Sequence, residues 1–280
     1  MTTQNPVMSP QLHVARKAAS AAAQILRRRF ADLGNLEMRV KGDAEHYDGI
    51  VTSADLESEQ VIVAAIRDQF PDHAFLAEEE HGLDQSALNS EHLWVIDPLD
   101  GTNNFAHGIE HYAISIAYYC QGQPDCGVIV RPESEQVFWA QRGEGAWFRD
   151  RQGTVKQSVV NQHRTFPETM LGVGFYYDRG AMMRRTLETV EALFQQQIHG
   201  IRRMGTAALD LVQVGMGCFG GFFEYQLSPW DFAAARLFVE ESGGKLTTCE
   251  GQPLELCTSS VLATNGHLHD AMLDIVRRGG

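Results

Sequence analysis

The chain has little of what marks membrane proteins and nucleic-acid-binding proteins. It contains no uninterrupted apolar stretch near the about 20 residues that cross a bilayer, so we expect no membrane span. Its 23 Lys and Arg residues stand against 36 Asp and Glu, a formal net charge of −13. The broad basic surface that binds nucleic-acid phosphates is therefore missing, and nucleic acid is a disfavoured partner.

Cysteine is scarce as well, and its spacing indicates no metal site. The five cysteines are odd in number and lack the close pairs typical of zinc ligands. The amino terminus, residues 11–30, lacks the basic start, apolar middle and small-residue cleavage site of a signal peptide. We therefore expect reduced cysteines and a cytoplasmic protein. We interpret Arg27, Arg28 and Arg29 as a solvated helix face or a dimer contact.

What the chain does have is enough apolar material for a large core. With 280 residues, 44% of them apolar, it can form one large unit or two subdomains of about 100–150 residues each. A polar, glycine-containing stretch at 149–156 is where we expect a boundary. This predicts an amino-terminal α+β subdomain over residues 1–150 and a carboxy-terminal subdomain over 151–280.

Periodicity and turn residues predict alternating helices and strands. The expected helices cover 11–30, 55–70, 181–197, 205–216 and 232–242. The expected strands cover 112–119 and 126–130, joined around Gly122, and 136–140 and 146–148, joined around residues 143–145.

The most informative segment is residues 94–108, where an apolar strand runs into two carboxylates. Pro98 is expected to end the strand's pairing, which aims Asp97 and Asp100 rigidly. Gly101 permits close backbone approach to a ligand, and a helix opening at Thr102 would present free N–H groups to an anion. Mg²⁺ prefers such oxygen ligands. In isolation, an Asp-rich turn that caps a helix explains the same residues equally well.

Two further acidic segments decide between these interpretations. Glu78, Glu79 and Glu80 follow a short apolar stretch, and alone they would be a solvated turn. Asp231 opens a predicted helix, where an acidic residue is an ordinary cap. Their occurrence together with Asp97 and Asp100 favours a shared metal site.

Taken together, these segments resemble the inositol monophosphatase family of magnesium-dependent, lithium-sensitive phosphatases. The resemblance runs from about Lys41 to Gly244. The motifs that carry it are Val51-Thr52-Ser53-Ala54-Asp55, Ala77-Glu78-Glu79, residues 94–105, Gly205-Thr206-Ala207-Ala208, and Trp230-Asp231 leading to Gly243-Gly244.

The resemblance implies a fold, a cofactor and a set of roles. The fold would be the α+β sugar-phosphatase fold with α-β-α-β-α layers, with the cleft between subdomains and a homodimer as the assembly. Two or three Mg²⁺ ions per site would bind to Glu78, Asp97, the carbonyl of Leu99, Asp100 and Asp231. Asp55 and Thr102, with Glu78, would orient and deprotonate the attacking water. The small phosphorylated substrate would contact Gly101, Thr102, Ala207, Glu224 and Asp231. Lys41 is a weaker match to a family lysine, and we leave it out of the predicted site.

The predicted reaction is hydrolysis of a phosphate monoester by metal-activated water. We rank inositol monophosphate first as substrate. Histidinol phosphate, fructose 1,6-bisphosphate and adenosine 3′,5′-bisphosphate remain alternatives, because side chains near Ala207, Glu224 and residues 175–178 would select the alcohol.

Two other classes of function stay open. A phosphoaspartate phosphatase would use a strand-end Asp as nucleophile, but it needs two aspartates separated by one residue, and here Pro98 and Leu99 intervene. A partner-binding regulatory protein on a phosphatase scaffold is the second, with Arg202 and Arg203 as candidate contacts.

Overall fold

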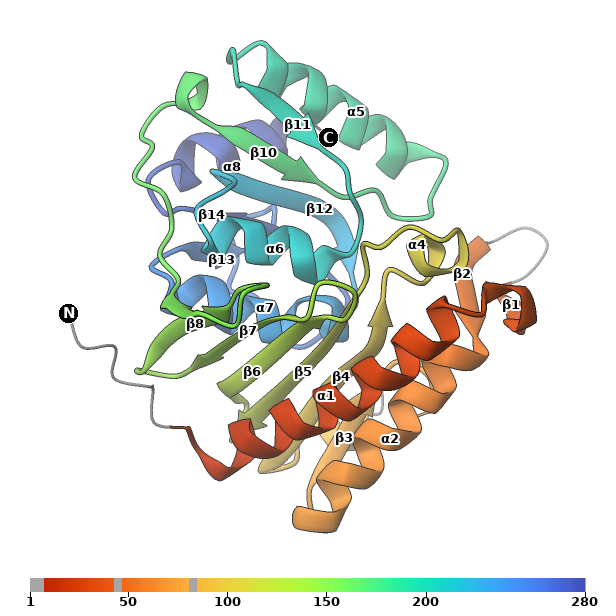
Figure 1. Cartoon of the computed structure of the whole chain (residues 1–280). Coiled ribbons are helices and arrows are strands. Elements are labelled where there is room, and N and C mark those ends of the chain that lie inside the picture. Colours follow the sequence, from red (N-terminus) through yellow and green to blue (C-terminus); the bar gives the residue numbers. More distant parts are fainter. Residues whose placement is uncertain (1–7, 43–46, 81–84, 280) are drawn as a thin grey trace.

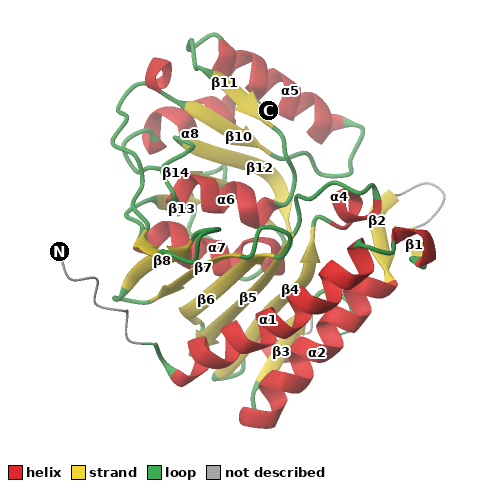
Figure 2. Cartoon of the chain, viewed as in Figure 1, coloured by secondary structure: helices red, strands yellow, loops and turns green. Residues whose placement is uncertain are grey.

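The computed structural model describes residues 8–42, 47–80 and 85–279, which form five stacked layers in the order α-β-α-β-α (Figure 2). This confirms the predicted fold class. Two helices cover a seven-stranded sheet, two further helices separate it from a five-stranded sheet, and a last pair covers the outer face. In the described part of the chain no helix has the length and apolarity needed to cross a bilayer. All five cysteines are free thiols.

The first layer contains α1 (Pro10–Phe30) and α2 (Ser53–Gln69), both close to their predicted ranges. Ser9 caps α1 by accepting from the Leu12 N–H, and Thr52 with Asp55 forms a capping box at the start of α2. One side of α1 consists of alanine and leucine residues, which are buried against the sheet. The two helices therefore fix one face of the sheet (Figure 1).

The seven-stranded sheet has the order β3-β4-β5-β6-β7-β8-β9. β3 and β4 are parallel, and the remaining neighbours are antiparallel, including both predicted hairpins. The first hairpin turns at Gln121 and Gly122, which both have positive φ, so its second strand begins earlier than expected. The strands are β3 (Ala74–Ala77), β4 (His92–Asp100), β5 (Ala113–Cys120), β6 (Gln123–Arg131), β7 (Gln136–Gln141), β8 (Gly145–Arg149) and β9 (Val155–Gln157).

Pro98 does not end the pairing of β4, so that expectation was wrong. The strand runs on to Asp100, which pairs with Ala113 of β5. A register shift between Asp97 and Asp100 places the proline in a bulge, where its missing N–H costs no ladder hydrogen bond. The bulge sets the relative direction of the two carboxylates.

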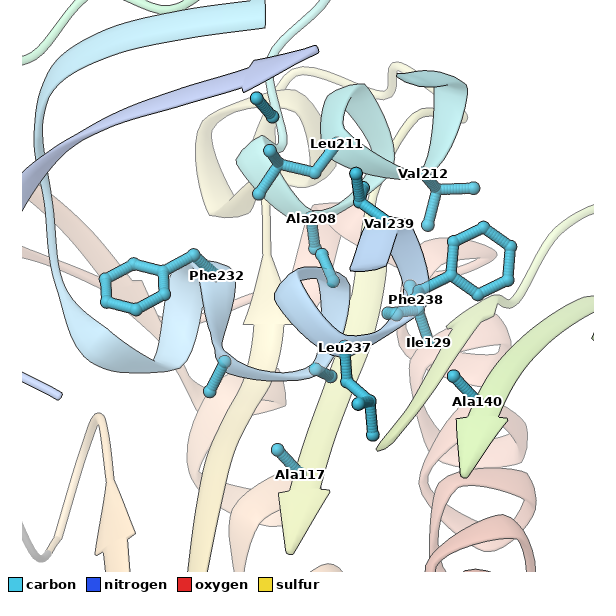
Figure 3. Packing of buried hydrophobic residues seen from close by; sticks show 14 of the residues in the cluster. Ala117, Ile129, Ala140, Ala208, Leu211, Val212, Phe232, Leu237, Phe238 and Val239 are labelled. Atoms are coloured by element: carbon cyan, nitrogen blue, oxygen red, sulfur yellow. The ribbon is translucent and has the colours of Figure 1, made fainter. Parts of the chain in front are cut away.

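The central layer consists of α6 (Ala207–Gly215) and α7 (Pro229–Glu241). Figure 3 shows apolar side chains of both helices, among them Leu211, Val212, Leu237 and Phe238, in one cluster with Ala117, Ile129 and Ala140 of β5, β6 and β7. Both helices begin within a few residues of the predicted positions. Because this packing fixes the helices, their amino ends are held rigidly between the two sheets.

The five-stranded sheet has the order β11-β10-β12-β14-β13 and is covered by α5 (Ala181–Phe194) and α8 (His269–Arg278). Helix α5 ends three residues earlier than predicted, and Gln197 beyond it has a positive φ of 61°. The strands are β10 (Met170–Val173), β11 (Gly200–Arg202), β12 (Gly221–Leu227), β13 (Lys245–Thr247) and β14 (Ser259–Thr264).

The remaining elements are short. A two-stranded sheet pairs β1 (Met38–Gly42) with β2 (Tyr47–Thr52), and α3 (Gln85–Leu88) and α4 (Thr102–Ala106) are single turns or little more. β9 still pairs with β8, and the second sheet starts at Met170. The division of the chain near residue 150 remains a prediction.

Candidate active site

One cavity of ≈ 510 Å³ gathers almost all of the predicted site residues. It lies where β3 and β4 end and where α6 and α7 begin, elements that converge in the middle of Figure 1. Asp55 lies behind its wall, in contact with Thr102. The predicted residues that line the cavity are Glu78, Asp97, Leu99, Asp100, Gly101, Thr102, Ala207, Glu224 and Asp231.

Asp55 is completely buried at the third position of α2. Its Oδ2 accepts from the backbone N–H and the hydroxyl of Thr52, at 2.8 and 2.6 Å. Its Oδ1 accepts from the hydroxyl of Thr102 at 2.9 Å. Burial raises the pKa of Asp55 to about 6 despite these hydrogen bonds. The carboxylate is thus a rigid acceptor that orients the Thr102 hydroxyl.

Helix α2 also holds the acidic turn that follows β3. The buried carboxylate of Glu59 accepts from the N–H groups of Glu79 and Glu80, at 2.9 and 2.8 Å. The Glu78 N–H donates to the carbonyl of Ile96 on β4, at 3.2 Å. Glu78 is therefore fixed beside the end of β4 by two neighbouring elements.

Lys41, absent from the predicted site, lies on the cavity wall. Its Nζ is 2.7 Å from Glu78 Oε1 and 2.6 Å from Glu79 Oε1. Burial by itself lowers the pKa of Lys41, but the two carboxylates outweigh burial and raise it. Burial raises the pKa of Glu79 to about 7. The pairing joins β1 to the turn after β3, which sequence spacing did not reveal.

Asp97 and Leu99 come from the bulge of β4. Asp97 is 1% exposed, and its Oδ1 accepts from the Leu99 N–H at 3.0 Å. The Leu99 carbonyl accepts from the Thr102 hydroxyl at 3.0 Å. Burial, followed by the charges of Glu78, Asp100 and Asp231, raises the pKa of Asp97 well above its usual range. Four predicted ligands therefore feel one another's charge.

Asp100 connects β4 to α6. Its Oδ2 accepts from the Ala208 N–H at 2.8 Å, and burial raises its pKa to about 7. Thr206 caps α6 from a backbone with φ of 37°, a strained conformation for threonine. Gly101 has φ of 95°, and a Cβ there would lie 2.6 Å from Cγ2 of Thr206. Only glycine therefore fits at position 101, where the end of β4 lies against the start of α6.

Asp231 occupies the third position of α7, where its Oδ2 accepts from the Ser228 N–H at 2.7 Å. This is the ordinary capping geometry considered from sequence. The same carboxylate also lines the cavity, and burial together with Asp100 and Glu78 raises its pKa well above its usual range. Asp231 therefore both caps α7 and lines the cavity.

The cavity wall carries a large excess of negative charge. It bears seven carboxylates and two cationic side chains. Within the described ranges no three acidic, His or Cys side chains form a ready-made metal shell. The mutual charge effects on Asp97 and Asp231 nevertheless leave the buried carboxylates undercompensated. Hard divalent cations suit this set of oxygen donors.

The cavity is also lined by Glu224 of β12, Asp210 of α6 and Arg203. A Cβ on Gly174 would lie 1.7 Å from Oε2 of Glu224, so this glycine makes room for the carboxylate. Burial raises the pKa of Glu224 and of Asp210 to about 8 each. Asp210 Oδ1 is buried and accepts no hydrogen bond from the described part of the chain. Sequence analysis missed Asp210 and Gly174, whose local patterns are those of an ordinary helix and loop.

The segment predicted to select the alcohol divides into two parts. Phe175, Tyr176 and Tyr177 line the cavity, and the Tyr177 hydroxyl accepts from the Asn103 side chain at 3.2 Å. Asp178 instead accepts from the Gly180 N–H at 2.7 Å, at the start of α5.

The two arginine groups singled out in the sequence also lie in different surroundings. Both side chains are exposed, but Arg203 lines the cavity, whereas Arg202 on β11 is not among its lining residues. Arg29 of α1 pairs with Glu57 of α2, and the Arg28 guanidinium lies 3.8 Å from the same carboxylate. The role of these groups as contacts to a partner remains a prediction.

Comparison with known proteins agrees with the fold and with the motifs. The sequence model of the inositol monophosphatase family matches residues 8–279. An inositol-1-monophosphatase of Rhizobium meliloti is 34% identical, covering 96% of this chain and 97% of that protein. The Nus factor SuhB of Pseudomonas aeruginosa is 35% identical, with the same shares covered. The crystal structure of the suppressor protein SuhB from Bartonella henselae has a TM-score of 0.87 at 33% identity, over 97% of this chain and 100% of that one. The chain belongs to the inositol monophosphatase family.

Proposed function

We propose that this protein hydrolyses a small phosphate monoester, with inositol monophosphate as the preferred substrate. The observation that carries the proposal is the meeting of Glu78, Asp97, Asp100 and Asp231 in one cavity. They come from three separate parts of the chain, and ordinary capping or turn chemistry gives no reason for them to converge. The hydrogen bond between Asp55 and Thr102 lies directly beside them.

Mg²⁺ is the cofactor that fits these donors, at two or three ions per site. The ligands would be Glu78, Asp97, the carbonyl of Leu99, Asp100 and Asp231. When bound, the ions would neutralise the carboxylates, lower the pKa of a coordinated water and stabilise charge on the phosphoryl oxygens.

The chain's own groups would orient the attacking water. The Thr102 hydroxyl has acceptors in Asp55 and the Leu99 carbonyl, so its proton is already engaged and its oxygen is left to accept from a water. Glu78 lies on the same wall and would take the second proton. A water held by both groups would point a lone pair toward the phosphorus.

The alcohol would lie toward Glu224 and Asp210. Two carboxylates that face the cavity there are acceptors for neighbouring hydroxyls, and Arg203 moderates their charge. A polyol such as inositol supplies several hydroxyl donors, whereas an apolar alcohol would leave the acceptors unpaired.

Phosphate release from four substrates tests the proposal: inositol 1-phosphate, histidinol phosphate, fructose 1,6-bisphosphate and adenosine 3′,5′-bisphosphate. Each is measured with Mg²⁺ and with EDTA, and with and without Li⁺. We expect Mg²⁺-dependent turnover that is fastest with inositol 1-phosphate. Turnover that persists in EDTA, or a trapped phosphoryl-enzyme, would contradict the proposed mechanism.

A regulatory role is a second candidate, because one relative bears the name Nus factor SuhB. We propose that any such role uses the outer surface and is separable from hydrolysis. A pull-down with wild-type protein and with Asp100→Asn tests this, since both should retain the same specific partner. The homodimer and the cytoplasmic location expected from the sequence remain predictions.

A further inference from the structure

A second cavity, of ≈ 430 Å³, lies between α1 and strands β6 to β8. It shares no lining residue with the candidate active site. Its charged lining consists of Arg16, Lys17 and Arg27 from α1, Arg149 from β8, and Glu135. Four cationic side chains thus face one carboxylate, and Glu135 is itself largely exposed.

The net positive charge of the residues that line this cavity is opposite in sign to the net charge of the whole protein. The chain has a formal net charge of −13, yet its first acidic residue is Asp32. Helix α1 therefore contributes cations to the cavity and no carboxylate at all. The amino-terminal segment that precedes the helix has no acidic residue to neutralise them. We call this second cavity the basic pocket. Its excess of positive charge is local, because the chain as a whole is acidic.

The guanidinium groups are held by neutral acceptors. Arg149 Nη2 donates to the Glu135 carbonyl, and Arg27 Nη1 donates to the Pro132 carbonyl, both at 3.2 Å. The Glu135 carboxylate is 3.8 Å from Arg27. Carbonyls satisfy N–H groups and fix the side chains, but they do not neutralise a guanidinium charge, and Glu135 supplies the one carboxylate among the lining residues. Arg149 Nε is buried, and nothing in the described part of the chain accepts its proton.

Arg16 completes the wall. Its guanidinium carbon lies over the Trp139 ring of β7, 4.3 Å from the centroid, in a cation–π contact that holds the side chain against the sheet. Burial, and then the charge of Arg149, lowers the pKa of Arg16, so the two guanidinium groups repel each other across the pocket. Val130 and Val137 supply apolar surface beside them. A bound anion would relieve the repulsion.

We infer that this basic pocket binds a small organic phosphate, with the phosphate between Arg16, Lys17 and Arg149 and the organic part against the two valines. Arginine forks from two different elements suit a phosphate dianion, which accepts several hydrogen bonds at once. The volume suits a molecule as large as a sugar phosphate or a mononucleotide. The inference is independent of the proposed function, since it involves no residue of the candidate active site.

Isothermal titration calorimetry in EDTA tests the inference, because without metal the cavity carboxylates have no cation that could bridge them to a phosphate. The probes are ribose 5-phosphate, uridine 5′-monophosphate and inorganic phosphate, with uncharged ribose as the control. We expect one saturable site per chain for an organic phosphate and none for ribose. The relative affinities of the two organic probes tell whether the pocket suits a sugar or a nucleoside.

Variants locate the site. Arg149→Gln and Lys17→Gln should each weaken binding by about 10-fold or more, whereas Arg149→Lys, which keeps the charge but loses the fork, should weaken it less. Arg28→Gln is the matched control, because it removes the same charge from another part of α1 and its side chain is 73% exposed. Asp100→Asn should bind the probes as wild type does.

Two results would overturn the inference: no saturable binding of any probe, or equal weakening by Arg28→Gln and Arg149→Gln, which would indicate diffuse electrostatic attraction. Lys17 is exposed, so its substitution leaves the fold intact even where Arg149→Gln does not.

Discussion

The acidic cavity and the basic pocket are both concentrations of like charge, but they are built in opposite ways. The carboxylates of the cavity come from turns, strands and helix starts spread along the chain from Glu78 to Asp231. Three of the four cations of the pocket come from one helix, α1. The carboxylates are held together only by the complete fold, because they come from distant segments. The cations of α1 lie on one side of the helix because of their spacing along the sequence.

The two sites also differ in how burial acts on their charges. Burial raises the pKa of the carboxylates, so protons can relieve their repulsion when no metal is bound. Arginine cannot lose its proton at ordinary pH. The pocket therefore depends on an anion for relief, and the cavity depends on protons or on metal.

The largest expected effect is on catalysis at the acidic cavity. Asp100→Asn should lower turnover of inositol 1-phosphate by about 1000-fold or more at saturating Mg²⁺, because it removes a charge that stabilises the proposed site. The amide oxygen can still accept from the Ala208 N–H, so the thermal unfolding transition should stay cooperative. Asp178→Asn is the control, because this carboxylate caps α5 and should leave turnover unchanged. Full activity of Asp100→Asn would refute the assignment.

The second-largest effect is the stabilisation by Mg²⁺, which should depend on the acidic cavity and not on the basic pocket. Mg²⁺ at about 100 times its dissociation constant should raise the free energy of unfolding by about 2.7 kcal/mol. Denaturant titrations with and without Mg²⁺ measure the gain. Asp97→Asn should lose most of it, while Arg149→Gln should keep all of it. A gain that is unchanged in Asp97→Asn would show that the stabilising cation binds elsewhere.

Proton uptake by the cavity predicts a smaller effect. Burial raises the pKa of Asp210 to about 8, above its unfolded value, so the stability that this group contributes is lost as the pH rises from the unfolded pKa through about 8. Folded protein without metal therefore gains stability from this group as the pH falls from 8 to 5. Asp210→Asn should raise the free energy of unfolding at pH 8 by about 2 kcal/mol and at pH 5 by less.

Denaturation of both proteins in EDTA at these two pH values provides the measurement. An equal difference between wild type and Asp210→Asn at pH 5 and pH 8 would mean that Asp210 does not titrate in this range.

The smallest expected effect concerns the shape of the substrate end of the cavity. Gly174→Ala should displace the Glu224 carboxylate, since the added Cβ would lie 1.7 Å from its Oε2. We expect KM for inositol 1-phosphate to rise by about 10-fold with a smaller change in kcat. Gly34→Ala is the matched control, because no atom lies within 4 Å of its Cβ position. Equal kinetics of the two variants would remove Glu224 from the proposed substrate contacts.

The helices and hairpins could be predicted because their patterns are local. The capping residues Thr52, Thr206 and Ser228 lie next to apolar runs that mark the helix starts within a few residues. Pro98 misled the prediction of β4, because a bulge tolerates proline and no short-range pattern announces a bulge. Lys41 was left out for a similar reason, since its partners Glu78 and Glu79 are brought to it by the packing of separate elements.

By itself the sequence determined the five long helices, the two hairpins, the family and the identity of the acidic residues, because these depend on residue type and on spacing along the chain. Only the tertiary structure decided that Asp210 lies near Glu224 with one buried carboxylate oxygen unpaired among the described residues, that Gly174 makes room for a carboxylate, and that Arg149 and Arg16 line one pocket. The physical reason is that burial and electrostatic repulsion depend on distances in space, and packed layers bring together groups that the chain keeps far apart.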